Sequence, residues 1–414
     1  MTDSEFSEIY RTYYGTLFSS LVSFFGMKLV EEAEDIVQDT FTSAYQSWQK
    51  GLPKDPKAWL FKVCKNKALN HIQKKSTQDR NLKSMYEPES YQEYQLGLAF
   101  SPNELKNQKL RVMFTLCHPV LSEKMQLILM LKVILGFSRD QISKGLGITK
   151  ESVKKILYRG KQKLKEAGIS LKTPYLFQLS SRLQCVQKSL YILFNEGYHA
   201  SEGGEIISKD FCLEALFLLK MLIEEGIHNP STQALLALMY FNLARFESRI
   251  GPDGSIIDLE NQDRQLWDRK IISVGMKYLR SSREGNMLSR YHLEAAIASL
   301  HCTAPTFEAT NWRLIVSYYE KLYSMAASPF IQLNRCIALS YAENPGNALK
   351  EMERYDLATK LKDYFLFHVT EGKLLIRLGR KEEALKSFQQ GHALANLAAE
   401  KIYIQQCIDS LSDS

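Results

Sequence analysis

The segment 138–161, which is rich in lysine and arginine, has the start and stop signals of two consecutive helices. Ser138 and Gln141 have the spacing of an N-terminal capping box, and Gly147 suits the left-handed turn that separates two helices. Thr149 suits the cap of the second helix. The pattern predicts a helix-turn-helix.

The second helix of this segment carries apolar residues on one face and polar residues elsewhere. Val153, Ile156 and Leu157 face inward. A helix of this width fits the DNA major groove, where its N-terminal side chains reach base edges and its basic flank meets phosphates. A solvated basic helix in a bundle is the alternative, but capping, turn and charge together favour DNA binding. The candidate DNA-binding residues are Lys150, Glu151, Lys154, Tyr158, Arg159 and Lys161.

A second basic block interleaves lysines with aromatic and amide side chains. Residues 57–80 hold seven basic residues and one acidic residue. Three amides follow one another at spacings of four and three, so they share a helix face and have the groups to read bases. A tryptophan in this block has the ring to stack on an unpaired base, although at this spacing it is more typical of a core. The candidates here are Lys57, Trp59, Asn66, Asn70, Gln73 and Lys74.

A third block is acidic. Residues 31–39 hold five acidic residues and no basic one. Such a block repels DNA, so beside two basic blocks it favours a separate protein-binding face. Its alternative interpretation is a helix start whose acids are stabilised by the helix dipole.

The composition bounds the class of protein. The 414 residues are 45% hydrophobic and 24% charged, as in globular proteins. Residues 1–170 hold 26 Lys and Arg against 18 Asp and Glu, whereas residues 171–414 hold 27 against 28, so the basic character belongs to the N-terminal part. No apolar stretch is long enough to span a bilayer and the acidic N-terminus lacks a signal-peptide start, which predicts a cytoplasmic protein with no membrane partner. Seven scattered cysteines indicate reduced thiols, with no disulfide framework, metal site or cofactor expected.

Periodicity predicts an all-α chain. Apolar residues recur at helical spacing over residues 3–25, 30–48 and 57–75, and strand alternation is almost absent. Beyond Pro174, helix follows helix, and Asn347-Ala-Leu and Glu383-Ala-Leu repeat 36 residues apart, which favours a tetratricopeptide-like array. The predicted domains are a first helical domain at 1–76, a linker at 77–104, a helix-turn-helix domain at 105–170 and a helical extension at 175–414.

The first 170 residues resemble a known family. Asp35-x-x-Gln38-x-x-Phe41, then Trp59-Leu60 and Asn66, then a linker, a helix-turn-helix and a basic tail, are similar to regions 2 and 4 of bacterial RNA polymerase sigma factors of the extracytoplasmic-function type. The large region absent between the two domains in that family is absent here too. The resemblance implies a sigma factor that binds core RNA polymerase and promoter DNA.

The resemblance also implies roles for individual residues. Asp35, Gln38, Asp39 and Phe41 match positions that contact core polymerase. Asn66 and Asn70 match positions near the minus-10 element, and the loop 50–57 matches the one that holds a flipped base. Lys154, Tyr158 and Arg159 match positions that face the minus-35 element.

The remainder resembles the C-terminal extension of the sigma-factor subgroup that carries a tetratricopeptide-like domain. The similarity rests on Tyr191-Ile-Leu-Phe-Asn-Glu-Gly-Tyr, Leu259-Glu-Asn-Gln-Asp-Arg-Gln-Leu-Trp, Tyr291-His-Leu-Glu-Ala-Ala and Leu333-Asn-Arg. It implies regulation by the extension, whose partner is an unknown protein, peptide or small molecule. Candidate residues for an extension pocket or interdomain contact are Asn195, Glu196, Tyr198, Asp263 and Arg264. Purely structural roles, as helix caps and an ion pair, are the favoured alternative.

Two other classes of protein are rivals. The first is a helix-turn-helix regulator with a helical sensor domain, which assigns no function to residues 1–75. An enzyme in the C-terminal half is disfavoured because the common nucleotide, hydrolase and zinc-protease motifs are missing and the histidines are dispersed. No catalytic residue is assigned.

Overall fold

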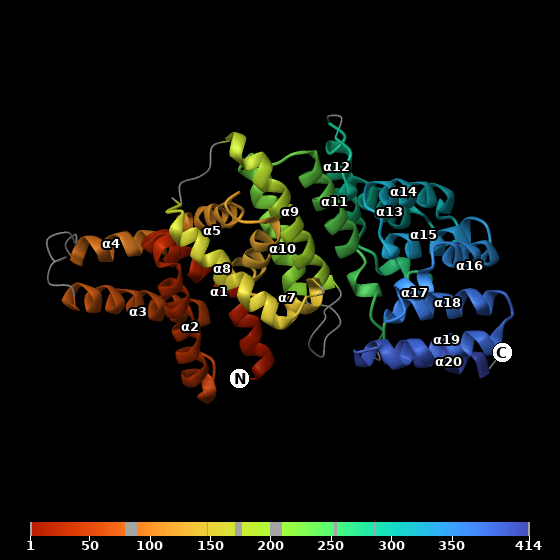
Figure 1. Ribbon diagram of the computed structural model, residues 1–414, viewed down its shortest axis with the longest axis horizontal. Coiled ribbons are helices and arrows are strands. Elements are labelled where there is room, and N and C mark those ends of the chain that lie inside the picture. Colours follow the sequence, from red (N-terminus) through yellow and green to blue (C-terminus); the bar gives the residue numbers. More distant parts are fainter. Residues whose placement is uncertain are drawn as a thin grey trace. The chain divides into compact units, whose positions relative to one another are not determined.

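The chain folds into helices. The computed structural model describes residues 2–78, 89–146, 148–169, 176–198, 209–251, 255–284 and 287–412. Within these ranges the regular elements are helices, with one isolated bridge between Ile250 and Ile256 (Figure 1), so the predicted all-α class is confirmed. The chain forms two compact units: unit 1 holds residues 1–202 and 208–215, and unit 2 holds residues 203–207 and 216–414.

Unit 1 begins with three helices at the predicted positions. Thr2 caps the first helix in a capping box with Glu5, and the predicted apolar face of this helix is buried, Tyr14 and Phe18 completely. Its helices are α1 (Asp3–Phe25), η1 (Met27–Leu29), α2 (Val30–Ser47), η2 (Trp48–Lys50), α3 (Pro56–Gln78), α4 (Glu89–Ala99), α5 (Pro102–Leu116), α6 (Glu123–Leu129), η3 (Met130–Ile134), α7 (Arg139–Leu146), α8 (Lys150–Glu166), α9 (Leu176–Tyr198) and the start of α10 (Lys209–Glu224).

The segment 77–104, which the sequence predicts to be a linker, contains helix α4. Its polar composition hides two apolar residues, Leu96 and Ala99, which are buried where α4 packs against α1 and α3. Burial of these two side chains supplies the tertiary stabilisation that a short polar helix lacks by itself. Residues 79–88 lie outside the described ranges.

Helix α9 lies in unit 1, although the sequence assigns residues from 175 onward to a separate extension. Its apolar face, with Val186, Leu190 and Leu193 buried, packs against α5, α6 and η3. The Arg182 guanidinium donates to the Phe114 carbonyl oxygen at 3.0 Å. The first helix of the predicted extension is therefore part of the packing of the helix-turn-helix domain.

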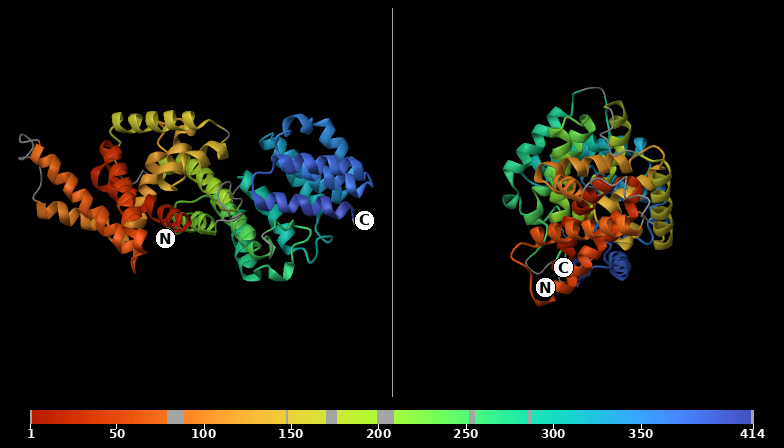
Figure 2. Two further views of the ribbon diagram at one scale, coloured as in Figure 1. Left: turned by 90° about the horizontal axis from the view of Figure 1, so that it is seen from below. Right: turned by 90° about the vertical axis from the view of Figure 1, so that its left-hand side faces the viewer.

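Unit 2 is a series of helices in which neighbours in the sequence pack against one another (Figure 2), among them α11 with α12, α14 with α15 and α18 with α19. Helices α18 and α19 show the small-and-bulky packing that the repeat predicts: Phe388 is fully buried, and a Cβ at Gly372 would lie 2.7 Å from its ring. The helices are α11 (Pro230–Leu243), η4 (Phe246–Ser248), η5 (Arg264–Leu266), α12 (Arg269–Ser281), α13 (Arg290–Thr303), α14 (Trp312–Met325), α15 (Pro329–Ala342), α16 (Pro345–Arg354), α17 (Leu357–Lys360), α18 (Phe365–Arg377), α19 (Lys381–Leu394) and α20 (Ala398–Ser412).

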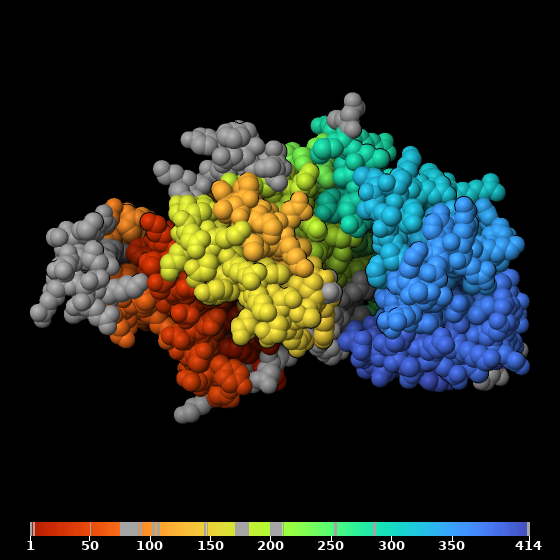
Figure 3. All heavy atoms as spheres, in the orientation of Figure 1, coloured from red at the N-terminus to blue at the C-terminus, as the bar shows by residue number. Residues whose placement is uncertain are grey.

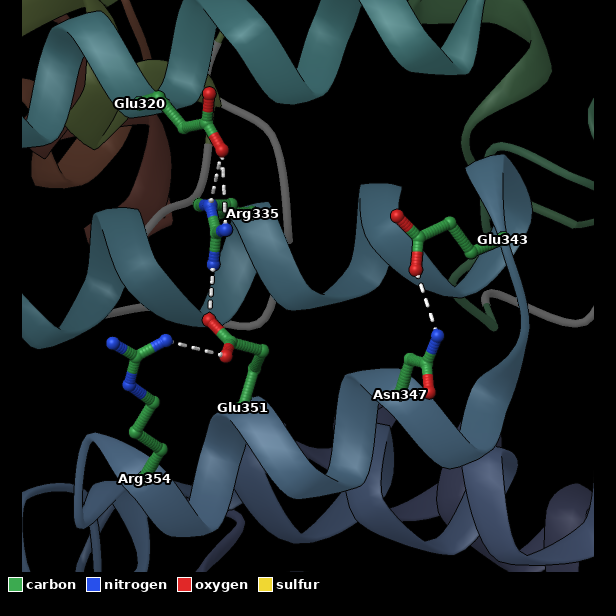
Figure 4. Close-up of polar contacts among 6 residues, drawn as sticks. All are labelled: Glu320, Arg335, Glu343, Asn347, Glu351 and Arg354. Carbon is green, nitrogen blue, oxygen red and sulfur yellow. Dashed lines mark hydrogen bonds and ion pairs between the residues drawn. The ribbon is translucent and has the colours of Figure 1, made fainter.

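An ion-pair network joins three successive helices of this series (Figure 4). Arg335 of α15 donates to Glu320 of α14 at 3.1 Å and to Glu351 of α16 at 2.8 Å. Arg354 also donates to Glu351, at 3.2 Å. Because the Arg335 side chain is only 14% exposed, removal of one of its acidic partners would leave a largely buried guanidinium with one partner fewer, which is destabilising.

Candidate nucleic-acid interface

The predicted helix-turn-helix is present as α7 and α8. The Ser138 amide donates to Gln141 Oε1 at 2.8 Å and the Gln141 amide donates to Ser138 Oγ at 3.0 Å, which completes the predicted capping box. Thr149 Oγ1 accepts from the Ser152 amide at the start of α8, as predicted. Gly147, predicted to make the turn, lies outside the described residues.

Helix α8 buries one face and leaves the other open. Val153, Leu157 and Leu164 are buried, while Ile156 is half-buried. The side chains of Lys150, Glu151, Lys154, Tyr158 and Arg159 are exposed, and Figure 3 shows the surface formed around this helix in yellow. Five of the six residues predicted to meet DNA from α8 are thus accessible to a ligand, and Tyr158 is 63% exposed.

Helix α3 presents the predicted row of amides to solvent. Asn66, Asn70 and Gln73 are exposed, as are Lys57 and Lys74. The helix starts at a cap from Asp55, whose carboxylate accepts from the Ala58 amide at 2.9 Å. This cap fixes the direction in which the loop 51–55 enters the amide-bearing helix.

Trp59 belongs mainly to the packing of unit 1. It is half-buried, and its ring lies edge-on to the fully buried Trp48, with centroids 5.2 Å apart. This geometry agrees with the core role that its spacing suggested. Its partial exposure leaves part of the residue open to solvent near the start of α3.

The acidic block lies on α2 and splits into an exposed set and a buried set. Asp35, Gln38 and Asp39 are exposed. Burial and the like charges of Glu34 and Asp39 raise the pKa of Asp35, so the cluster is electrostatically crowded and suited to a cationic partner.

Phe41 is a core residue and not a surface contact. It is 3% exposed and packs against Tyr10, with ring centroids 4.6 Å apart. On α2 it belongs to the buried stripe that includes Val30, Ala33 and Val37. Any effect of this residue on a partner must pass through the position of α2.

Glu34 joins α2 to α8 within unit 1. The residue is 8% exposed, and its carboxylate accepts from the Tyr14 hydroxyl at 3.4 Å and forms an ion pair with Lys161 of α8. Lys132 of η3 is also within electrostatic reach, and burial lowers the pKa of this lysine. Lys161, predicted to meet DNA, is therefore engaged by α2 in this structure.

The residues predicted for the extension lie in α9 and in η5. Asn195, Glu196 and Tyr198 lie within the last turns of α9 and not in a break after it, because α9 continues to residue 198. Asp263 caps η5, and Arg264 donates to the carbonyl oxygens of His301 at 2.8 Å and Ala304 at 2.9 Å. The ion pair between Asp263 and Arg264 that the sequence suggested is replaced by these carbonyl contacts.

Unit 2 contains a cavity of about 310 Å³ that these five residues do not line. Its wall includes the stacked rings of Trp312 and Tyr341, with centroids 4.7 Å apart. At one side Asp258 forms an ion pair with Lys373 and accepts from the Tyr403 hydroxyl at 3.3 Å. The cavity has the size and mixed lining of a small-ligand site, with its strongest charges already paired.

Comparison with known families places two matches on the modules described above. Residues 9–78 match sigma-70 region 2, and residues 111–164 match sigma-70 region 4. The chain belongs to the sigma-70 family. Residues 182–283 match a family of unknown function (DUF6596), so this sigma factor carries a helical extension beyond its two promoter-recognition domains. The resemblance to extracytoplasmic-function sigma factors with a C-terminal extension is therefore confirmed.

A curated relative aligns with this chain over nearly its whole length. This sigma factor is 32% identical over 386 residues to an uncharacterized protein of Rhizobium meliloti (strain 1021), covering 92% of this chain and 90% of the relative. The comparison with solved structures found no match. Across the described ranges no helix is long and apolar enough to cross a membrane.

Sequence reasoning missed Glu34 as the centre of the contact between the two modules. The signal was present, because Glu34 falls in the same helical stripe as Val30, Ala33 and Val37. A carboxylate in an apolar stripe requires a buried partner. Its partners, Tyr14 and Lys161, could not be identified because they are far away in the sequence.

Proposed function

We propose that this chain binds core RNA polymerase through the exposed acids of α2 and directs initiation at promoters that it reads with α3 and α8. One observation supports the proposal most strongly. Each of the two sigma-70 matches contains a helix with an exposed polar face, α3 in the region 2 match and α8 in the region 4 match, and the two regions follow one another in the order found in the family. Core polymerase supplies the catalysis, and this chain supplies promoter-specific binding energy.

The two faces would do different work. Helix α8 has the width, basic flank and exposed N-terminal turns for base readout in the major groove, with lysine–phosphate contacts adding salt-dependent affinity. The amide row on α3 suits a melted minus-10 strand, where capture of an extruded base offsets an unstacking cost of a few kcal/mol. Lys57, Lys74 and Lys150 would contribute phosphate contacts, and Glu151 lies where it could accept from a cytosine amino group.

Unit 1 must open to bind both promoter elements together. Elements centred near minus 10 and minus 35 are about 25 base pairs apart, or roughly 85 Å along B-DNA at 3.4 Å per pair. A compact unit of about 200 residues is only about 45 Å across. We therefore infer that core binding separates α2 from α8 and releases Lys161 for DNA.

The extension would regulate this opening. Arg182 of α9 donates a hydrogen bond to the end of α5. At the start of α10, Glu214 forms an ion pair with Lys109, and Phe211 stacks on Phe137 with ring centroids 5.3 Å apart. These contacts stabilise the closed unit, so the extension is proposed to inhibit. A Phe211→Ala variant should raise transcription, and unchanged transcription would refute inhibition through this contact.

Binding to core polymerase tests the central part of the proposal. The purified chain should form a complex with core enzyme on size exclusion, and a double Asp35→Lys, Asp39→Lys variant should weaken the complex while leaving DNA affinity unchanged. A chain that binds promoter DNA but not core polymerase would instead be an ordinary helix-turn-helix regulator.

A further inference from the structure

Helix α12 of unit 2 carries exposed charge of one sign. Residues 269–283 hold five basic residues and no acidic one, although residues 171–414 as a whole hold 27 basic against 28 acidic residues. The nearest acids in the sequence are Asp268, whose carboxylate caps the start of α12, and Glu284, which follows the helix. The five basic residues are all exposed: Arg269, Lys270, Lys277, Arg280 and Arg283.

The packing of α12 fixes which side of the helix meets solvent. Ile272, Gly275 and Leu279 are buried where α12 packs against α11 and α13, the helices that are labelled next to it in Figure 1. A Cβ at Gly275 would lie 2.9 Å from the Phe241 ring, so α12 approaches α11 closely. At 3.6 residues per turn, four basic residues share an arc of about 100° on the side turned away from this packing: Arg269, Lys270, Lys277 and Arg280. These four residues form the basic face of α12.

The basic face lacks the acidic partners that other exposed arginines of unit 2 have. Arg290 pairs with Glu294 and Arg380 pairs with Glu383, each within one turn of helix. Across the ranges that the structure describes, no side chain of the basic face forms an ion pair. Cations one turn apart on a helix repel each other, and an external anion would relieve this repulsion.

The stability of the helix by itself does not explain these charges. The helix dipole favours a cation near the C-terminus of a helix, which accounts for Arg280 in the last turn. Arg269 and Lys270 lie in the first turn, where the dipole disfavours a cation. The Asp268 carboxylate offsets part of this cost, but two exposed cations at a helix start gain most from an anion outside the chain.

We propose that the basic face of α12 binds the phosphate backbone of duplex DNA. The inference rests on the proposed function, because a chain that binds promoters carries its extension to duplex DNA. The four residues span about 16 Å along the helix at 1.5 Å per residue, which equals the axial length of about five base pairs. Ser273 is exposed between them, and its hydroxyl can donate to a phosphate oxygen. Because phosphate contacts carry no base information, this face would add affinity and not sequence readout.

The salt dependence of DNA binding tests the proposal. The full chain, without polymerase, is titrated with fluorescent duplex DNA at several salt concentrations. A triple variant, Lys270→Gln, Lys277→Gln and Arg280→Gln, should reduce the slope of log affinity against log salt by about 2–3, since each phosphate contact contributes about 0.9. Its affinity at low salt should fall at least tenfold.

A control variant removes the same charge elsewhere in unit 2. Lys321→Gln, Lys381→Gln and Lys401→Gln change exposed positions on α14, α19 and α20 and should keep the wild-type slope. A charge-preserving variant, Lys270→Arg, Lys277→Arg and Arg280→Lys, should also keep it. A loss of slope shared by either of these variants would overturn the proposal, because the effect would then come from total charge or from the fold.

Two duplexes separate this inference from the proposed function. The triple variant should lose the same affinity on a mapped promoter and on a scrambled duplex, whereas Arg159→Glu should reduce the preference for the promoter. A wild-type slope in the triple variant overturns the inference, even where the variant binds core polymerase more weakly, because the face would then serve a protein partner. A reduced slope together with no promoter preference in the wild type supports the inference and contradicts promoter readout.

Discussion

Replacing Lys161 with methionine tests the contact between α2 and α8. The change keeps the length of the side chain and removes the ammonium group, which leaves the Glu34 carboxylate without its cation. The Lys161 and Glu34 side chains are only 15% and 11% exposed. Breaking a fully buried pair costs about 3–5 kcal/mol, so a pair with slight exposure should lose about 2 kcal/mol.

The assay is hydrogen exchange of α2 and α8 peptides in the full chain. A loss of about 2 kcal/mol in the free energy of local opening accelerates exchange roughly 30-fold where opening limits protection. Lys165→Met is the matched control, because Lys165 lies on the same helix and is exposed, and its substitution should change exchange very little.

A double-mutant cycle with Glu34→Gln separates the pair from its surroundings. Because the two side chains interact directly, the double variant should be less destabilised than the sum of the single variants by about 1 kcal/mol or more. Equal exchange in the Lys161→Met and Lys165→Met variants, together with an additive cycle, would refute the inference that this ion pair holds unit 1 closed.

Three further predictions concern the surface and the array. A double Asp35→Lys, Asp39→Lys variant should lose at least tenfold in affinity for core polymerase measured by fluorescence titration, and equal affinity would mean that these acids do not contribute to core binding. Gly372→Ala should lower the unfolding midpoint by forcing its new methyl group against Phe388, at a cost of about 1–3 kcal/mol, and an unchanged melting curve would contradict the close packing. The hydrogen bond from Arg335 lowers the pKa of Glu351, so the ionised Glu351 side chain stabilises the folded protein above about pH 4.5, and this stabilisation is lost as the pH falls further. Thermal melts of the wild type and of Glu351→Gln at pH 7 and 3.5 test this, because the variant should lose less stability between the two pH values than the wild type does.

The sequence was most informative where a helix carries its own start and stop signals. The ends of α1, α14 and the helix-turn-helix follow from local caps and apolar spacing, so they could be predicted closely. Helix α4 could not, because its stability comes from packing that only the folded unit provides. Asp268 caps α12, which begins at Arg269.

The candidate site shows the same division between local and distant information. The exposed positions on α3 and α8 follow from helical periodicity, which the sequence contains. The engagement of Lys161 by Glu34 and the burial of Phe41 depend on which helices meet, and pairings between distant segments are not encoded in local spacing. The packing of α9 against α5 and α6 could not be predicted for the same reason, because it joins a helix beyond residue 175 to segments far away in the sequence.

Run-off transcription with purified core polymerase and no other sigma factor tests the central claim most directly. With a template that carries a promoter mapped after overexpression of the chain, the wild type should give a defined transcript, and Arg159→Glu should reduce it at least tenfold without changing affinity for core enzyme. Absence of a specific transcript with the wild type on mapped templates, or equal transcription by the Arg159→Glu variant, would contradict the account.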